Sequence, residues 1–177
     1  MNVCVYGAAS QKLAAEYLAS ARALGTALAE AGFGLVFGGG DTGVMGACAR
    51  GASAAGGRVI GVAPRFFDQE GVLYQHCTEF HFTDTMRQRK ELMESLSDAF
   101  VMAPGGIGTM EEFFEIFTLR QLDRHRKPIF ILNTEGYYDP LVAMLENAVR
   151  EGFLDRTCLG LYQIFRNPTE LADALKD

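Results

Sequence analysis

The segment PGGIGTMEEFFEIF, Pro104–Phe117, places a glycine-rich loop directly before two adjacent glutamates. The free N–H groups at the start of a helix attract anions, and glycine lets the backbone approach them closely. We therefore interpret Gly105, Gly106, Gly108 and Thr109 as a phosphate cradle. A carboxylate one helical turn further on could act on a sugar bound beside that phosphate.

A second interpretation of the same residues is purely structural. Thr109-x-x-Glu112 matches a capping box, in which Thr109 caps the helix and Glu112 turns back to its N–H group. Physical reasoning alone does not choose Glu112 over Glu111 as a catalytic residue. The helical spacing predicts a buried apolar stripe composed of Met110, Phe113, Phe114 and Phe117. The glutamates lie outside this stripe. A catalytic Glu112 should instead point into an open cleft.

A second glycine-rich loop, GGGDTGVMG, follows the predicted strand Gly34–Phe37. We interpret Gly39 and Gly40 as a second wall of the phosphate site, although tight turning alone would also explain them. The loop is not a dinucleotide fingerprint, because it follows the second strand and the third strand does not end in an acidic residue. It is not a P-loop either, because Lys-Ser or Lys-Thr does not follow it.

A basic segment, MRQRKE, lies before the strand that leads into PGGIGT. In isolation, Arg87, Arg89 and Lys90 would be a solvated helix face. Next to an anion site, an arginine could bind phosphate in bidentate fashion, and we predict that Lys90 also contacts the phosphate.

The surrounding secondary structure must position these residues. Short apolar runs, typical of strands, alternate with helical patterns along the whole chain. The predicted strands are Asn2–Tyr6, Gly34–Phe37, Arg58–Val62, Glu79–Phe82, Ala99–Ala103, Pro128–Leu132 and Leu161–Phe165. The predicted helices are Lys12–Ala31, Val44–Ala55, Thr85–Ser97, Thr109–Leu122, Leu141–Glu151 and Thr169–Leu175. This alternation predicts an α/β fold: one Rossmann-like, doubly wound parallel sheet with helices on both faces, forming a single domain over residues 1–177.

Ligands of such sheets bind beyond the carboxyl ends of the strands, where the strand order reverses. The loops Gly7–Ser10, Gly38–Gly43 and Pro104–Gly108 all follow predicted strands, so we expect them to converge there. Ser10 could then add a hydroxyl group to the phosphate site. The irregular segment Arg65–Gln75 is expected to lie over the site and to shape its base pocket.

The composition restricts the partners. The chain has 177 residues and a net charge of −6, which argues against a nucleic-acid polymer. Four scattered cysteines and three histidines do not form a zinc pattern, and they indicate a reducing compartment. No apolar run reaches the roughly 18 to 20 residues that span a bilayer. We expect a cytoplasmic protein that binds neither a membrane nor a metal.

GGGDTGVMG, MRQRK and PGGIGTMEE, in this order and spacing, resemble the Lonely Guy family, long mislabelled as lysine decarboxylases. The resemblance covers nearly the whole chain, including GVAP and EGYYDPL. It implies a cytokinin riboside 5'-monophosphate phosphoribohydrolase, which cleaves a purine nucleoside 5'-monophosphate into free base and ribose 5-phosphate. It also implies a homodimer or higher homo-oligomer, with the site near the subunit interface.

The resemblance assigns roles to individual residues. The family's motif glutamate, at the end of PGGxGTxxE, falls on Glu112, and its catalytic arginine falls on Arg89. The carboxylate would stabilise an oxocarbenium-like state and position water, and no cofactor is implied. Two departures matter: Gly7-Ala8-Ala9-Ser10 replaces the usual Gly-Ser-Ser, and Arg87 replaces a frequent histidine.

Two other functions remain open from the sequence. A carrier of the same fold could hold a nucleotide or cofactor without hydrolysing it, and testing AMP for release of adenine distinguishes the two. A lysine decarboxylase would need a lysine for pyridoxal phosphate, and none of the chain's four lysines, Lys12, Lys90, Lys127 and Lys176, has a convincing setting.

Overall fold

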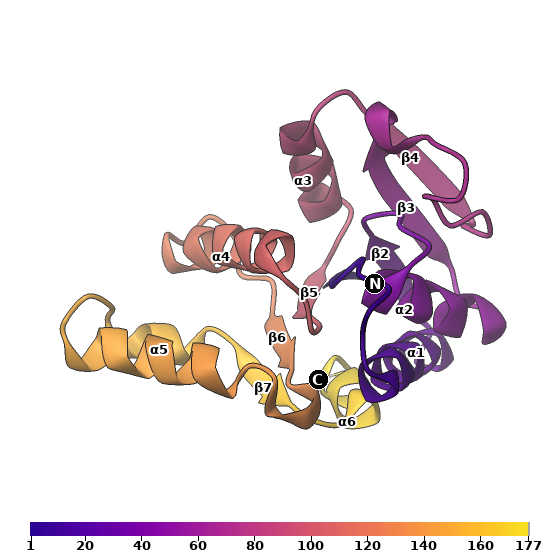
Figure 1. Cartoon of the computed structure of the whole chain (residues 1–177). Coiled ribbons are helices and arrows are strands. Elements are labelled where there is room, and N and C mark those ends of the chain that lie inside the picture. Colours follow the sequence, from indigo (N-terminus) through magenta and orange to yellow (C-terminus); the bar gives the residue numbers. More distant parts are fainter. Residues whose placement is uncertain (177) are drawn as a thin grey trace.

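Seven strands form one parallel sheet in the computed structural model, which describes residues 1–176. The strand order is β4-β3-β2-β1-β5-β6-β7 (Figure 1). The strands are β1 (Asn2–Tyr6), β2 (Gly34–Phe37), β3 (Val59–Pro64), β4 (Glu79–Thr83), β5 (Ala99–Met102), β6 (Ile129–Leu132) and β7 (Gln163–Phe165). The four strands β2, β3, β5 and β6 are buried along their whole length, as expected when helices cover both faces of a parallel sheet.

Six α-helices connect the strands and confirm the doubly wound fold. They are α1 (Ala15–Glu30), α2 (Gly43–Ala54), α3 (Met86–Ser95), α4 (Ile107–Gln121), α5 (Asp139–Arg150) and α6 (Pro168–Ala174). Three short 3₁₀ helices are η1 (Arg65–Phe67), η2 (Thr134–Gly136) and η3 (Arg156–Gly160). The predicted elements are all present, and their ends lie within three residues of the observed ends.

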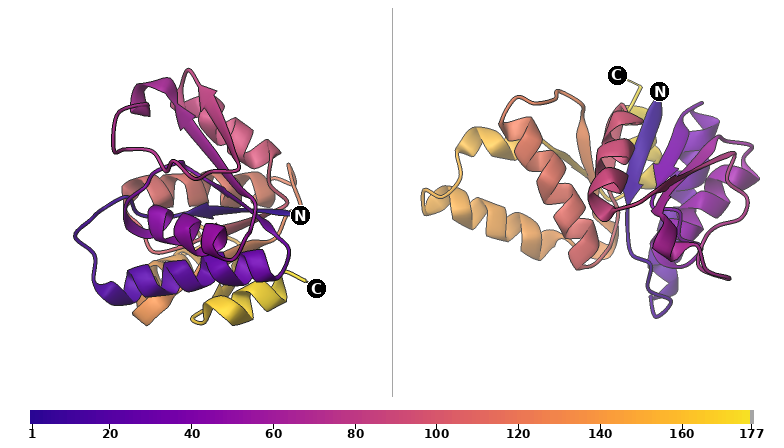
Figure 2. Two further views of the ribbon diagram at one scale, coloured as in Figure 1. Left: turned by 90° about the vertical axis from the view of Figure 1, so that its right-hand side faces the viewer. Right: turned by 90° about the horizontal axis from the view of Figure 1, so that it is seen from above.

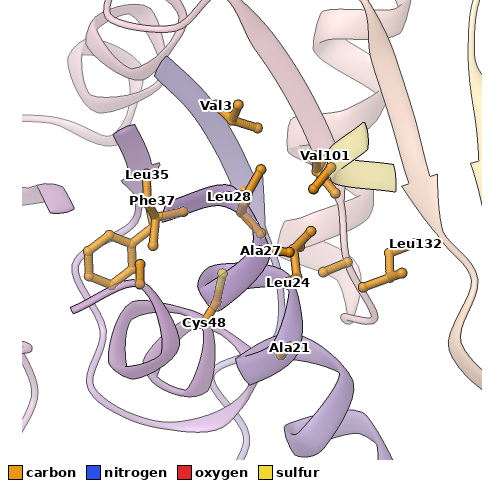
Figure 3. Close-up of a cluster of buried hydrophobic side chains, with 14 of the residues drawn as sticks. Val3, Ala21, Leu24, Ala27, Leu28, Leu35, Phe37, Cys48, Val101 and Leu132 are labelled. Atoms are coloured by element: carbon orange, nitrogen blue, oxygen red, sulfur yellow. The ribbon is translucent and has the colours of Figure 1, made fainter. Parts of the chain in front are cut away.

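The sheet separates two hydrophobic cores. Val3 and Val5 of β1 point towards α1, α2 and α6, whereas Cys4 and Tyr6 point towards α3, α4 and α5. Figure 3 shows part of the first core, where Leu24 and other residues of α1 lie between β1 and α2. Figure 2 shows α1 and α6 side by side on this face. The second core contains the helices that carry the basic segment and the glutamates.

The direction in which the strands are added reverses between β1 and β5. The chain builds β2, β3 and β4 outward on one side of β1, and then returns to add β5, β6 and β7 on the other side. The loops after β1 and β5 therefore lie next to each other. The Ala8 N–H donates to the Pro104 carbonyl at 3.1 Å, and the Met45 N–H of α2 donates to the Ala8 carbonyl at 3.2 Å.

Within residues 1–176, no helix combines the length and the apolar character needed to cross a bilayer. The same residues contain no group of three or more His, Cys, Asp or Glu side chains that could hold a metal ion.

Candidate active site

A cleft of about 390 Å³ lies at the point where the strand order reverses. The loops after β1 and β5 and the helices α2, α3 and α4 form its walls. The lining residues are Gly7, Ala8, Ala9, Ser10, Met45, Phe67, Met86, Arg89, Gly106, Gly108, Thr109, Glu111 and Glu112. Ligands of doubly wound sheets bind at this place.

Arg89 of α3 and Glu112 of α4 form a buried ion pair in the cleft wall. Arg89 Nη1 donates to Glu112 Oε1 at 2.7 Å, and Arg89 Nε donates to the Val62 carbonyl of β3 at 3.1 Å. The two residues are only 6% and 9% exposed. The carboxylate is therefore held from a neighbouring helix, and one edge of it faces the cleft.

The start of α4 differs from the capping box considered from the sequence. The helix begins at Ile107 with Gly106 as its N-cap, so Thr109 lies inside the first turn. The carboxylate of Glu112 accepts a hydrogen bond from Arg89 and not from the Thr109 N–H. The capping interpretation is wrong, because the glycine that precedes the helix already provides its N-cap.

The predicted apolar stripe of α4 is also partly wrong. The buried residues of this helix are Thr109, Glu112, Phe113, Ile116 and Phe117. Phe114, expected inside, is 37% exposed, whereas Glu112, expected outside, is buried. The helix is turned so that Glu112 faces the sheet, and Arg89 makes this burial of a carboxylate possible by neutralising it.

Burial raises the pKa of Glu112 above its ordinary value, and the nearby Arg89 lowers it, with burial the larger effect. Arg89 thus favours the ionised carboxylate but does not cancel the effect of burial. A carboxylate whose pKa is raised towards neutral pH is a better proton acceptor than an ordinary one.

Two glycines make room for this arrangement. A Cβ at Gly38 would lie 2.0 Å from Arg89 Nη2, so a side chain there would displace the guanidinium from its observed place. A Cβ at Gly105 would lie 2.1 Å from Thr109 Oγ1, so glycine there lets the threonine fold back over the loop. The role of Gly38 cannot be recognised from the sequence, because it depends on Arg89, which lies about 50 residues further on.

Gly39 and Gly40 do not line the cleft. Gly39 has a φ of +78°, which favours glycine, and its carbonyl accepts from the Tyr74 N–H at 2.9 Å. Gly40 forms an antiparallel bridge with Leu73. These two glycines fasten the segment between β3 and β4, and phosphate binding by them stays a prediction without support from this geometry.

Lys90 lies outside the cleft. Its ammonium pairs with Glu111 and Glu115 of α4, which raise its pKa. Phosphate binding by Lys90 therefore also stays an unsupported prediction. Arg87 is exposed.

Four of the other residues predicted for the phosphate site come together in the cleft, whereas the fifth, Gly105, is buried beside it and lines a smaller neighbouring cavity. Ser10, Gly106, Gly108 and Thr109 all line the cleft. A Cβ at Gly106 or at Gly108 would meet no atom within 4 Å, so open space lies in front of this turn. The first N–H groups of α4 have no acceptor in the preceding turn, and they form a positive end suited to an anion.

Apolar side chains form another part of the cleft. Met45 of α2, Phe67 of η1 and Met86 of α3 line it together. Phe67 belongs to the segment Arg65–Gln75 that was expected to lie over the site, whereas Tyr74 of that segment is buried against Phe37 in the core. The two methionines could not be predicted as site residues, because in the sequence they resemble ordinary core residues.

Comparison with known proteins gives consistent matches. The sequence model of one family, described as possible lysine decarboxylase, matches residues 45–175. A probable cytokinin riboside 5'-monophosphate phosphoribohydrolase of Oryza sativa subsp. japonica is 42% identical over 86% of this chain, which spans 62% of that protein. The cytokinin riboside 5'-monophosphate phosphoribohydrolase of Rhodococcoides fascians is also 42% identical, over 86% of this chain and 78% of its own length. That of Mycobacterium tuberculosis is 38% identical over 99% of this chain and 91% of its own length.

Solved structures share the fold at lower sequence identity. The molybdenum cofactor carrier protein of Chlamydomonas reinhardtii matches with a TM-score of 0.74 and 23% identity, over 99% of this chain and 95% of that one. A molybdenum cofactor binding protein from Rippkaea orientalis matches with a TM-score of 0.72 and 22% identity, over 99% and 93%. At this identity the similarity concerns the fold alone. By its sequence, the chain belongs to the Lonely Guy family of cytokinin riboside 5'-monophosphate phosphoribohydrolases, whose family model still carries the description of possible lysine decarboxylase.

Proposed function

We propose that the protein hydrolyses the N-glycosidic bond of purine nucleoside 5'-monophosphates of the cytokinin type, releasing the free base and ribose 5-phosphate. The observation that carries this proposal is the buried Arg89–Glu112 pair in the wall of a cleft, one helical turn from the free N-terminus of α4. The sequence relatives with this activity in their names support it.

The geometry suggests where each part of the substrate would bind. The 5'-phosphate would accept hydrogen bonds from the first N–H groups of α4, with Thr109 and Ser10 beside it. The ribose would then lie against Glu112, one turn along the same helix. Met45, Phe67 and Met86 would cover the faces of the purine, since aromatic rings prefer apolar surroundings.

In the reaction, the bond between C1' of the ribose and the base nitrogen breaks, and its electron pair stays on the base. Positive charge develops on the sugar, where the Glu112 carboxylate would stabilise it. Glu112 would also accept a proton from the water that attacks C1', and the departing base takes up a proton. Arg89 would orient the carboxylate and contact the ribose or phosphate.

A carrier function is the second candidate, because two proteins with solved structures of this fold are a binding protein and a carrier protein of the molybdenum cofactor. A carrier needs an anion site but has no use for a buried carboxylate in its cleft wall. The Arg89–Glu112 pair therefore favours the enzyme.

The positions of the lysines count against a decarboxylase that uses pyridoxal phosphate. Lys90 is held by two carboxylates, the Lys127 ammonium donates to the Glu94 carbonyl, and Lys176 pairs with Asp173. Lys12 is exposed. None of the four lines the cleft.

The test is base release from a panel of nucleoside 5'-monophosphates, starting with AMP and isopentenyladenosine monophosphate and followed by chromatography. Glu112→Gln should lower kcat by about 10²- to 10⁴-fold, the usual effect of losing a general acid–base group. Glu115→Gln is the matched control, since Glu115 lies on the same helix but outside the cleft. Near wild-type turnover in Glu112→Gln would rule out the proposed role.

We also propose that the protein forms a homodimer or higher homo-oligomer. The amphipathic helix α5 supports this, because it buries only Leu145 although Val142, Met144 and Val149 are also apolar. Met144 and the nearby Phe153 are 61% and 87% exposed. Such a face is typical of a surface that a partner covers.

A cytoplasmic location is part of the proposal. All four cysteines are unpaired, and Cys4, Cys48 and Cys158 are buried. Free thiols without disulfides are typical of a reducing compartment.

A further inference from the structure

The segment EGYYDPL, shared with the family, lies outside the cleft but contacts the loop that forms it. The Tyr138 hydroxyl donates to the Ala103 carbonyl at 2.8 Å, and the Tyr137 hydroxyl donates to the Gly105 carbonyl at 2.8 Å. The Ala8 N–H holds the carbonyl between them, that of Pro104. Three successive carbonyls of the loop after β5 are therefore fixed by three different donors.

The hydrogen bond from Tyr137 has a direct geometric consequence. The Gly105 carbonyl and the Gly106 N–H belong to the same planar trans peptide unit, in which the two groups point in opposite directions. By holding the carbonyl on one side of the loop, Tyr137 fixes the direction of the Gly106 N–H on the other. Gly106 lines the cleft and is the N-cap of α4.

The loop has little other support at this point. A smaller cavity of about 220 Å³ lies behind it and shares Ala8, Ser10 and Gly106 with the main cleft. A Cβ at Gly106 would meet nothing within 4 Å. Gly105 packs against Thr109, but nothing packs against Gly106, so the orientation of the peptide on the Gly106 side depends on its hydrogen bonds.

The tyrosines themselves are firmly held. The Asn133 side chain accepts from the Tyr138 N–H at 2.7 Å and donates to Asp139 at 2.6 Å. Glu135 and Gly136 have φ values of 52° and 71°, and this sharp turn directs two consecutive tyrosines at one loop. A non-glycine residue in this region is strained, and such strain persists only where the surrounding contacts impose it.

We propose that Tyr137 is a positioning residue that aims the Gly106 N–H at the 5'-phosphate of the substrate, with Tyr138 as its buried anchor. The proposal rests on the proposed function for the identity of the anion. The two tyrosines differ in burial: Tyr138 is 1% exposed, whereas Tyr137 is 40% exposed. Tyr137 can therefore be changed without opening the core.

The test compares Tyr137→Phe with Tyr17→Phe. The Tyr17 ring lies edge-on to that of Tyr137, with 5.8 Å between the ring centroids, but its hydroxyl makes no hydrogen bond within residues 1–176. Tyr137→Phe should raise KM for AMP and the inhibition constant of inorganic phosphate by the same factor, about 3- to 10-fold, the value of one hydrogen bond. Its kcat should stay within about 2-fold, and its Tm should equal that of Tyr17→Phe. Equal KM values and equal phosphate inhibition in the two variants would overturn the proposal.

Failure of the proposed hydrolase function can be distinguished from failure of the positioning role of Tyr137. If the wild-type protein releases no base from any nucleotide, the Kd of AMP and of inorganic phosphate is measured by calorimetry in the same variants. Weaker binding of both anions by Tyr137→Phe alone would support the positioning role in a protein that does not hydrolyse them. Unchanged Kd values, or a wild-type protein that binds neither anion, would overturn it.

Discussion

At the scale of single residues, the environment distinguishes two adjacent glutamates. Glu112 is buried and bound to Arg89, whereas Glu111 has a half-exposed side chain that pairs with Lys90 at the rim. Tyr6 and Cys4 lie on the same face of the sheet beneath the pair, and burial raises the pKa of both groups, so they stay neutral. Arg89 and Glu112 are thus the two charged residues that are buried at the site.

The raised pKa of Glu112 predicts a shifted pH profile. Its carboxylate must be ionised to accept a proton, so activity falls as the pH drops through its pKa. Because burial raises that pKa, the acid limb of kcat/KM for AMP should lie above the pH at which an ordinary glutamate titrates. Measuring kcat/KM against pH at constant ionic strength checks this. An acid limb at the ordinary value would mean that Glu112 is not the titrating group.

The ion pair also predicts a specific pattern of stability. Arg89→Met leaves the Glu112 carboxylate buried without a partner and should lower the free energy of unfolding by about 3–5 kcal/mol. The double variant Arg89→Met/Glu112→Leu removes both charges and should recover most of this loss. Urea denaturation of the wild-type protein, Arg89→Met and the double variant measures these differences in the free energy of unfolding. Arg87→Met, at an exposed position of the same helix, should change stability by about 0.5 kcal/mol or less. Equal losses in the single and double variants would contradict the argument.

At the scale of elements, the site depends on a close approach between α3 and the end of β2. Gly38 follows β2, and its missing side chain leaves the space that the Arg89 guanidinium occupies. Arg89 reaches past it to both β3 and α4. One glycine thus determines whether the arginine can occupy its place between three elements.

Gly38→Ala should therefore displace Arg89 and lower kcat/KM for AMP by at least about 10-fold. Displacing a catalytic group by about 1 Å can lower the rate of a reaction by about 10²-fold. Gly160→Ala is a suitable control, because a Cβ there would meet no atom within 4 Å. Steady-state kinetics and the Tm of both variants test this. Full activity in Gly38→Ala would show that the guanidinium has freedom to move.

Most of the strands and helices could be predicted from the sequence. The short apolar strand runs and the longer helical patterns predicted each strand and helix, because burial of both sheet faces imposes this pattern. The inward position of Glu112 could not be predicted, because local periodicity assigns a carboxylate to the surface unless a partner neutralises it. That partner, Arg89, comes from another helix. The pairing of Lys90 with Glu111 and Glu115 was missed for the same reason.

At the scale of the whole molecule, the exposed apolar surface of α5 indicates an interface with a second copy. Met144→Asp would place a charge in such an interface and should shift the protein towards the monomer, because burying an unpaired charge is costly. Light scattering coupled to size-exclusion chromatography measures the mass of the assembly. Lys12→Asp, which also changes an exposed residue but on another part of the surface, should leave the mass unchanged. A wild-type protein that is already a monomer would contradict the proposal.

The reversal of strand order between β1 and β5 has a further consequence, for the order of folding. β1 pairs with β5 across nearly a hundred residues of chain, and the Asn2 N–H donates to Asp98 Oδ2 at 2.7 Å. Arg89 is packed on β3, on one side of this junction, whereas Glu112 follows β5 on the other. Closing so large a loop carries an entropic cost that local elements do not have. The chain therefore acquires its chemistry only when its two halves associate, and a partly folded intermediate with most of its helices would still be inert.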